Sequence, residues 1–119
     1  MIRLSVAVLL LASAGLACAH FGMIIPSDDI VTAGETPLLK LRVMFAHPFE
    51  GSVMEMAKPK EFGVLFRGRK LSLLDRLKPV KLKGYADEKG HQAWTAEYKL
   101  RRPGDYVFYL IPQPYWEPA

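Results

Sequence analysis

Hydrophobic and polar residues alternate along most of the chain with a period of two, which is the pattern of β-strands and not of helices. The clearest run covers residues 39–45, in which every second side chain is apolar. This alternation predicts a strand with one buried face. The side chains expected on that face are Leu39, Leu41, Val43 and Phe45.

Further segments carry the same strand signals, and turn residues separate them. They cover residues 64–66, 71–73, 80–84, 94–100 and 106–111. The first two flank residues 67–70, where Gly68 supplies the turn, so we expect a β-hairpin there. Turns are also expected at residues 87–90 and 103–105. Six short strands with regular turn signals predict an all-β fold, specifically an immunoglobulin-like β-sandwich.

Two segments do not fit this regular pattern. Residues 48–60 form the longest connection, where we expect a functional loop with a short helical turn. The last strand is followed by Tyr115 and Trp116, large aromatic side chains that normally pack on a surface or bind a partner. Because six strands are few for a closed sandwich, we expect an N-terminal fragment of a longer domain, incomplete at its C-terminus. A short complete protein with a disordered tail is the alternative.

The N-terminal residues have the layout of a secretory signal peptide. Arg3 is followed by the apolar run 4–14 and then by small residues, with Ala17 and Ala19 at the positions that signal peptidase recognises. The apolar run is too short to span a bilayer. We therefore expect residues 1–19 to be removed and the mature β-sandwich domain, residues 20–119, to begin at His20. A lipoprotein anchored through Cys18, or an uncleaved anchor, is the alternative.

Export changes the composition of the working protein. The 119-residue chain has 16 Lys and Arg, 12 Asp and Glu and one cysteine. Removing residues 1–19 takes away Arg3 and Cys18, which leaves 15 basic and 12 acidic residues and a net charge of +3. A domain without cysteine suits the bacterial periplasm better than a eukaryotic secretory pathway. The small, dispersed charge and the export signal argue against nucleic-acid binding.

Catalytic motifs of the common hydrolases and nucleotide-binding enzymes are absent from the sequence, and we expect no enzymatic activity. The three histidines all survive cleavage. The α-amino group and the imidazole of an N-terminal His20 can chelate a divalent metal together. His47, at the end of a strand and before Pro48, is the best candidate for a further imidazole ligand. His91 follows a turn glycine, where a histidine is usually solvated, and is a weaker candidate.

Other side chains could extend a metal site. Met54 and Met56 lie two residues apart and would favour copper, although such methionines are more often core residues. Several carboxylates could add oxygen ligands, although acidic residues in polar turns are usually just solvated. They are Asp28, Asp29, Glu50 and Glu55.

Three motifs carry a family resemblance. They are the Ala-His-Phe-Gly-Met-Ile-Ile-Pro-Ser stretch at 19–27, the Phe-Ala-His-Pro-Phe-Glu-Gly stretch at 45–51, and the segment from Pro-Gly-Asp at 103–105 to Tyr-Trp-Glu-Pro at 115–118. The chain resembles the periplasmic domain of unknown function numbered 4198, whose members are exported β-sandwich proteins that continue beyond the last motif. The resemblance implies a role in nickel or cobalt uptake beside a membrane permease of the energy-coupling-factor type. His20 and His47 lie within its motifs.

We therefore predict a periplasmic accessory protein that holds a divalent transition metal, nickel first and cobalt or copper next, through His20 and His47. It would touch the membrane only through its permease or an uncleaved signal. The alternatives are a copper-binding protein and a metal-free interaction module that docks a partner or a glycan through Tyr115 and Trp116. The last alternative is an oxidative enzyme whose metal is held by the same nitrogen donors.

Overall fold

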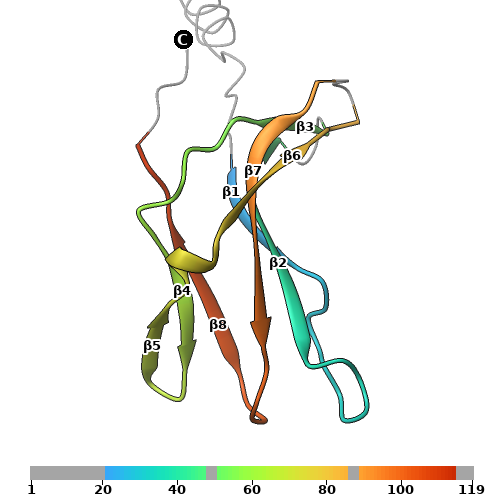
Figure 1. Cartoon of the computed structure of the whole chain (residues 1–119), viewed down its shortest axis with the longest axis vertical. Coiled ribbons are helices and arrows are strands. Elements are labelled where there is room, and N and C mark those ends of the chain that lie inside the picture. The colour runs from blue at the N-terminus through green and yellow to red at the C-terminus, as the bar shows by residue number, and fades with distance from the viewer. Residues whose placement is uncertain (1–20, 48–50, 86–88, 115–119) are drawn as a thin grey trace, which may run out of the picture.

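The computed structural model describes residues 21–47, 51–85 and 89–114, and these residues form eight strands and one 3-10 turn. Two antiparallel sheets face each other, as Figure 1 shows, so the predicted all-β sandwich is confirmed. The predicted signal peptide, residues 1–19, lies outside the described residues.

The larger sheet contains five strands. Its main order is β1 (Phe21–Pro26), β2 (Leu38–His47), β7 (His91–Lys99) and β6 (Lys78–Leu82). The short strand β3 (Ser52–Met54) pairs with the last residues of β2, beyond the point where β7 stops pairing with it.

The smaller sheet contains three strands, in the order β5 (Arg69–Ser72), β4 (Glu61–Phe66) and β8 (Tyr106–Ile111). The 3-10 turn η1 (Leu74–Arg76) carries the chain from β5 across to β6 in the larger sheet (Figure 1). An immunoglobulin-like domain places strands A, B, E and D in one sheet and C and F in the other. The chain order of the strands here corresponds to that arrangement, with β3 and β5 as additions.

The core lies between the sheets, and the face of β2 that the sequence predicted is buried. Leu39, Leu41, Val43 and Phe45 are 0–6% exposed, and Phe62 and Val64 of β4 face them at 0–1%. The alternation fails at the end of β2, because Met44 and Ala46 are also buried, at 7% and 5%. They belong to a second apolar cluster with Val53 and Ala93, on the opposite face of the larger sheet.

The predicted hairpin at residues 67–70 is confirmed. Phe66 pairs with Arg69, so Arg67 and Gly68 alone form the turn between β4 and β5. Their φ angles are +49° and +74°, which are the left-handed values of a type I′ turn. The right-handed twist of the two strands favours this turn, and Gly68 adopts its conformation without steric cost.

The turn before β8, predicted at residues 103–105, is fastened by a tyrosine. The Tyr106 hydroxyl donates a hydrogen bond to the carbonyl oxygen of Arg102 at 2.8 Å and accepts one from the Arg102 N–H at 3.3 Å. The Tyr106 ring stacks on Phe66, with the ring centroids 4.1 Å apart. A tyrosine whose hydroxyl bonds the backbone a few residues upstream, at the start of strand F, is typical of immunoglobulin-like sandwiches.

Two strands were not predicted. β1 carries apolar residues on both faces and so shows no alternation, because Ile24 packs on the central core and Met23 on the second cluster. β3 has only three residues. It lies in the connection 48–60, where a helical turn was expected. That expectation is wrong for the described part of the connection, residues 51–60. The predicted turn at 87–90 is described only at residues 89 and 90.

Candidate functional site

His47 is the last residue of β2, at the end of the larger sheet where β1 begins. The register of β1 against β2 starts with Phe21 opposite Ala46, and His47 pairs with Ser52 of β3 on the other side. The His47 carbonyl accepts a hydrogen bond from the Gly51 N–H at 2.9 Å, and the residue is partly buried. The starts of β1 and β3 therefore flank the end of β2 that carries His47.

His20 itself lies outside the described residues. Phe21, the residue after His20 in the sequence, is the first described residue and pairs with Ala46, the residue before His47. The sequence neighbour of His20 and His47 itself, 26 positions apart in the chain, thus lie at the same end of the same sheet.

His91 lies at this end of the molecule too, but β3 separates it from His47. Its Nδ1 lies 3.5 Å from Glu55 Oε1, and the same carboxylate lies 3.9 Å from Lys81 Nζ. His47 pairs with Ser52 of β3, whereas His91 pairs with Leu82 of β6 on the far edge of β7. The structure associates His91 with Glu55 and Lys81 and does not bring it against His47.

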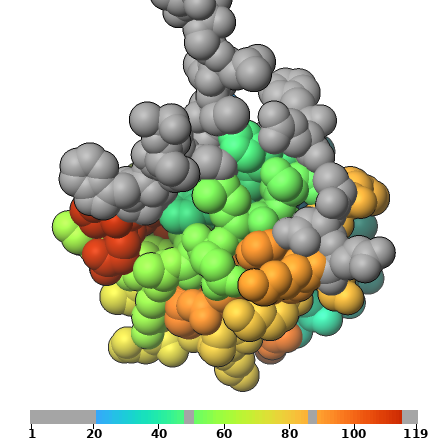
Figure 2. Space-filling view, turned by 90° about the horizontal axis from the view of Figure 1, so that it is seen from above, coloured from blue at the N-terminus to red at the C-terminus, as the bar shows by residue number. Residues whose placement is uncertain are grey.

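Both methionines pack in the central core but differ in burial. Met54 is partly buried and Met56 is 1% exposed, within the central core. The Met56 backbone joins this segment to β7, because its N–H donates to the Gln92 carbonyl at 3.0 Å and its carbonyl accepts from Trp94 Nε1 at 2.8 Å. Figure 2 shows the green residues of this segment against the orange start of β7. Core packing accounts for Met56, and a ligand role for either methionine stays a prediction.

Asp28 and Asp29 are far from His47. They lie in the connection after β1, whereas His47 lies beside the beginning of β1. A strand of six residues spans about 17 Å, so these carboxylates are at the other end of the sandwich. The expectation that they could share a metal site with His47 is therefore wrong. Glu50, Tyr115 and Trp116 lie outside the described residues.

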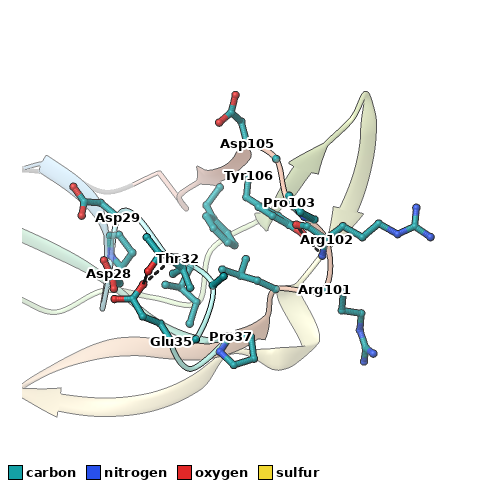
Figure 3. A pocket seen from close by; sticks show the side chains of 18 residues that line it. Asp28, Asp29, Thr32, Glu35, Pro37, Arg101, Arg102, Pro103, Asp105 and Tyr106 are labelled. Carbon is teal, nitrogen blue, oxygen red and sulfur yellow. Dashed lines mark hydrogen bonds between the residues drawn. The ribbon is translucent and has the colours of Figure 1, made fainter.

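A groove of about 810 Å³ opens at that other end (Figure 3). One wall is the connection between β1 and β2, and the other is the turn between β7 and β8. Leu39, Leu100 and Phe108 contribute apolar surface. Four of the twelve acidic residues of the chain line it but only two of the sixteen basic ones. The acidic residues are Asp28, Asp29, Glu35 and Asp105, and the basic ones are Arg101 and Arg102.

The groove is acidic in character. Figure 3 shows the side chains of Arg101 and Arg102 extending away from it. The Glu35 carboxylate accepts hydrogen bonds from the backbone N–H of Thr32 and, at 2.9 Å, from its hydroxyl. These hydrogen bonds stabilise the ionised form and lower the pKa of Glu35 below its ordinary value. Sequence reasoning missed the groove because its walls come from segments about 70 residues apart in the chain, and nothing local indicates that they pack side by side.

Neither a cluster of metal ligands nor a membrane-spanning helix is found among the described residues. They contain no group of three or more His, Cys, Asp or Glu side chains placed to hold a metal ion. No helix among them is long and apolar enough to cross a membrane.

Comparisons with known proteins identify the family. Neither the curated proteins nor the solved structures contain a match to this chain. One family matches, described as a domain of unknown function (DUF4198), and the match covers residues 17–119. It spans both histidine motifs and every strand of the sandwich. The chain therefore belongs to the DUF4198 family.

Proposed function

We propose that the mature protein binds a divalent transition-metal ion through His20 and His47 in the periplasm. The observation that carries this proposal is the register of β1 against β2, in which Phe21 pairs with Ala46. It places the residue after His20 in the sequence beside the end of β2 that carries His47, which supports a site shared by the two histidines. The two histidines were chosen from their sequence motifs, whereas the register of β1 against β2 is a property of strand pairing.

The donor set suits such an ion. After cleavage before His20, the chain would start with a free α-amino group, whose ordinary pKa of about 7.7–8.0 allows a metal to displace its proton near neutral pH. This amine, the His20 imidazole and the His47 imidazole would offer three nitrogen ligands. Nitrogen-rich sites suit Ni²⁺, Co²⁺ and Cu²⁺, and Cu²⁺ binds most tightly in the general order of affinities.

We further propose that the protein delivers the ion to a membrane permease and does not catalyse a reaction. Because nitrogen ligands alone prefer copper, selection of nickel or cobalt would depend on metal supply and on the permease. A permease of the energy-coupling-factor type is the expected partner. Copper handling with help from Met54 is the alternative within the same chemistry.

Calorimetric titration with Ni²⁺, Cu²⁺ and Zn²⁺ tests metal binding. The protein is exported with its own leader, and the mass of the mature chain establishes that it begins at His20. Three variants are compared with it: His47→Ala, His91→Ala, and a chain with one extra alanine before His20. We expect His47→Ala and the extra residue each to weaken binding by about tenfold or more, because even the loss of a group that only orients a ligand costs about 10–100-fold in affinity.

His91→Ala is the matched control, because it removes an imidazole from the same end of the molecule, beyond β3. It should bind the metal as the wild type does. Wild-type affinity weaker than millimolar for all three metals would refute the proposal. Binding that survives the extra residue would exclude the α-amino group and leave a site of side chains alone.

The groove favours a second candidate function, a binding module for an organic ligand. Its volume lies within the range of ordinary ligand pockets, and it combines apolar walls with carboxylates. A glycan or a peptide is the expected ligand class. Titration with soluble oligosaccharides and dipeptides, followed by amide chemical shifts, tests this. Shifts confined to residues 28–37 and 100–106 would support it, and their absence for every compound would refute it.

A further inference from the structure

Basic residues that are dispersed along the sequence meet at one end of the sandwich. The turn between β4 and β5 and the turn between β7 and β8 both lie there, because Phe66 at the end of β4 pairs with Tyr106 at the start of β8. Figure 1 shows the two turns at the bottom of the molecule. Residues 67–70 are Arg-Gly-Arg-Lys, and residues 101–105 are Arg-Arg-Pro-Gly-Asp. We call these two segments together the basic tip.

Contacts between the two turns hold them side by side. The Arg67 guanidinium donates a hydrogen bond from Nη2 to the Pro103 carbonyl oxygen at 3.1 Å. The rings of Phe66 and Tyr106 stack with their centroids 4.1 Å apart. Gly104 packs so closely on the Phe66 ring that a Cβ atom there would lie 2.7 Å from a ring carbon. The basic tip is therefore one continuous surface and not two separate loops.

The basic tip carries a surplus of positive charge. It contains five basic residues and one acidic residue, Asp105, so its net charge is +4, whereas the whole mature chain has a net charge of +3. All five basic side chains are exposed, and none is in an ion pair with a carboxylate of the part of the chain that the structure describes. They are Arg67, Arg69, Lys70, Arg101 and Arg102.

Structural roles account for only part of this charge. Lys70 lies over the Tyr109 ring, 4.7 Å from its centroid, and charges on an edge strand such as β5 also hinder pairing with another chain. Neither reason applies to Arg101 and Arg102, which lie in the turn between β7 and β8. Figure 3 shows their side chains extending away from the groove and its carboxylates. These arginines favour an anionic partner outside the described chain.

Exposed apolar side chains lie beside the cations. Leu65 of β4 pairs with Lys70 on one side and with Val107 on the other, so the three side chains form a row on the outer face of the smaller sheet. Leu65 is 41% and Val107 56% exposed. Surfaces that bind lipid bilayers combine cations, which attract anionic headgroups, with apolar side chains that enter the interface. The basic tip and this row have that combination.

We infer that the basic tip docks the protein on a bilayer surface that contains anionic phospholipids. Five cations spread over two turns suit an extended array of lipid phosphates better than a single small anion. The choice of a bilayer rests on the proposed periplasmic location, since a membrane bounds that compartment. The docking surface is distinct from the proposed metal site, because Leu38 pairs with Lys99 beside the basic tip and His47 is at the other end of β2.

Co-sedimentation of the mature protein with vesicles tests this inference. The leader must be absent, because its apolar run would itself bind lipid, and a chelator is added so that this test and the metal titrations succeed or fail independently. One set of vesicles contains equal parts of phosphatidylglycerol and phosphatidylethanolamine, and a neutral set contains phosphatidylcholine alone. Binding to heparin, a soluble polyanion, is measured in parallel.

The variants remove charge from the basic tip or from elsewhere. The double variant Arg69→Gln, Arg101→Gln removes one charge from each turn. Arg102→Gln is a second variant in case the double variant does not fold, as judged by circular dichroism. The matched control is Lys58→Gln, Lys60→Gln, which removes the same charge from the exposed connection before β4, at the other end of that strand.

We expect the wild type to bind the anionic vesicles and not the neutral ones. Each cation near an anionic surface strengthens binding about fivefold, so the double variant at the basic tip should bind about 25-fold more weakly and Arg102→Gln about fivefold. The control should bind as the wild type does, because the length of β4, about 17 Å, exceeds the Debye length of about 8 Å in 0.15 M salt.

Three results would overturn the inference. The first is a wild type that binds neither kind of vesicle. The second is an equal loss of binding in the control and in the double variant at the basic tip, because net charge alone would then explain the attraction. The third is binding to heparin without binding to vesicles, which would assign the basic tip to a soluble polyanion.

Discussion

Gly63→Ala should destabilise the domain, although alanine is normally the better residue in a strand. Gly63 is the buried central residue of β4, paired with Ser72 of β5 and Tyr109 of β8. A Cβ atom at this position would overlap the Tyr109 hydroxyl and the carbonyl oxygen of Leu71, and would lie 2.7 Å from the Tyr109 ring carbon Cζ. The Tyr109 ring therefore occupies the space that only a glycine leaves open.

The magnitude follows from two opposing effects. Replacing a strand glycine by alanine gains about 0.5–1 kcal/mol from the smaller loss of backbone entropy. Inserting a methyl group into a packed site costs about 1–3 kcal/mol, and here the cost is at the upper end because one obstacle is a backbone oxygen that cannot rotate away. We expect a net destabilisation of about 1–2 kcal/mol, which lowers the melting temperature by about 5–15 °C in a domain of this size.

Thermal and urea unfolding followed by circular dichroism measure this difference. Gly22→Ala is the matched control, since Gly22 is also an extended strand residue but its Cβ would meet only side-chain atoms, at 3.3 Å or more. Its stability should stay within about 0.5 kcal/mol of the wild type. In a Tyr109→Ala background, the cost of Gly63→Ala should shrink without vanishing, because the Leu71 oxygen remains. A Gly63→Ala protein as stable as the wild type would refute the steric reasoning.

Three further substitutions test other parts of the structure. Thr32 lowers the pKa of Glu35 in the folded state, so the ionised carboxylate stabilises the fold above the ordinary glutamate pKa of 4.5 and this stabilisation is lost as the pH falls below it. Glu35→Gln should abolish this effect, so the free energy of unfolding should differ less between pH 3 and pH 7 in the variant than in the wild type. An unchanged difference would contradict the prediction. Tyr106→Phe removes the hydroxyl that bonds the Arg102 backbone and should cost about 1 kcal/mol in urea unfolding; no loss would mean that solvent replaces this contact. Phe62→Ala empties a fully buried site and should cost about 3–5 kcal/mol, which calorimetry would detect as a large fall in melting temperature; a small fall would mean that the core collapses into the cavity.

The strands and their inward faces were largely predictable, because period-two alternation reports which side of a strand is buried. The alternation from Leu39 to Phe45 and the hairpin around Gly68 follow from local chemistry alone, and the structure agrees with both. The alternation gives the wrong burial for side chains on the outer face of the larger sheet, where a second layer of apolar residues covers them. Period-two alternation places Met44 on the face opposite to Val43 and Phe45, yet it is 7% exposed because it packs in the second cluster. β1 went unpredicted for the same reason.

The candidate site was predictable only as a set of residues. The sequence selects His20 and His47 as metal ligands, but it does not reveal that the strand after His20 pairs with the strand that ends at His47. It also offered Asp28 and Asp29 as neighbours of His47, and the length of β1 separates them. Alternation identifies the face of a strand but not its partner or register, which depend on contacts between residues far apart in the chain.

The sequence by itself therefore determined the export signal that we predict, the all-β class, the buried face of β2 and the family to which the chain belongs. The tertiary structure alone decided two things: the register of β1 against β2 and the groove between the two distant loops. Each of these arises when segments tens of residues apart pack together. Strand pairing and packing set that arrangement over the whole chain, and no local pattern of residues encodes it.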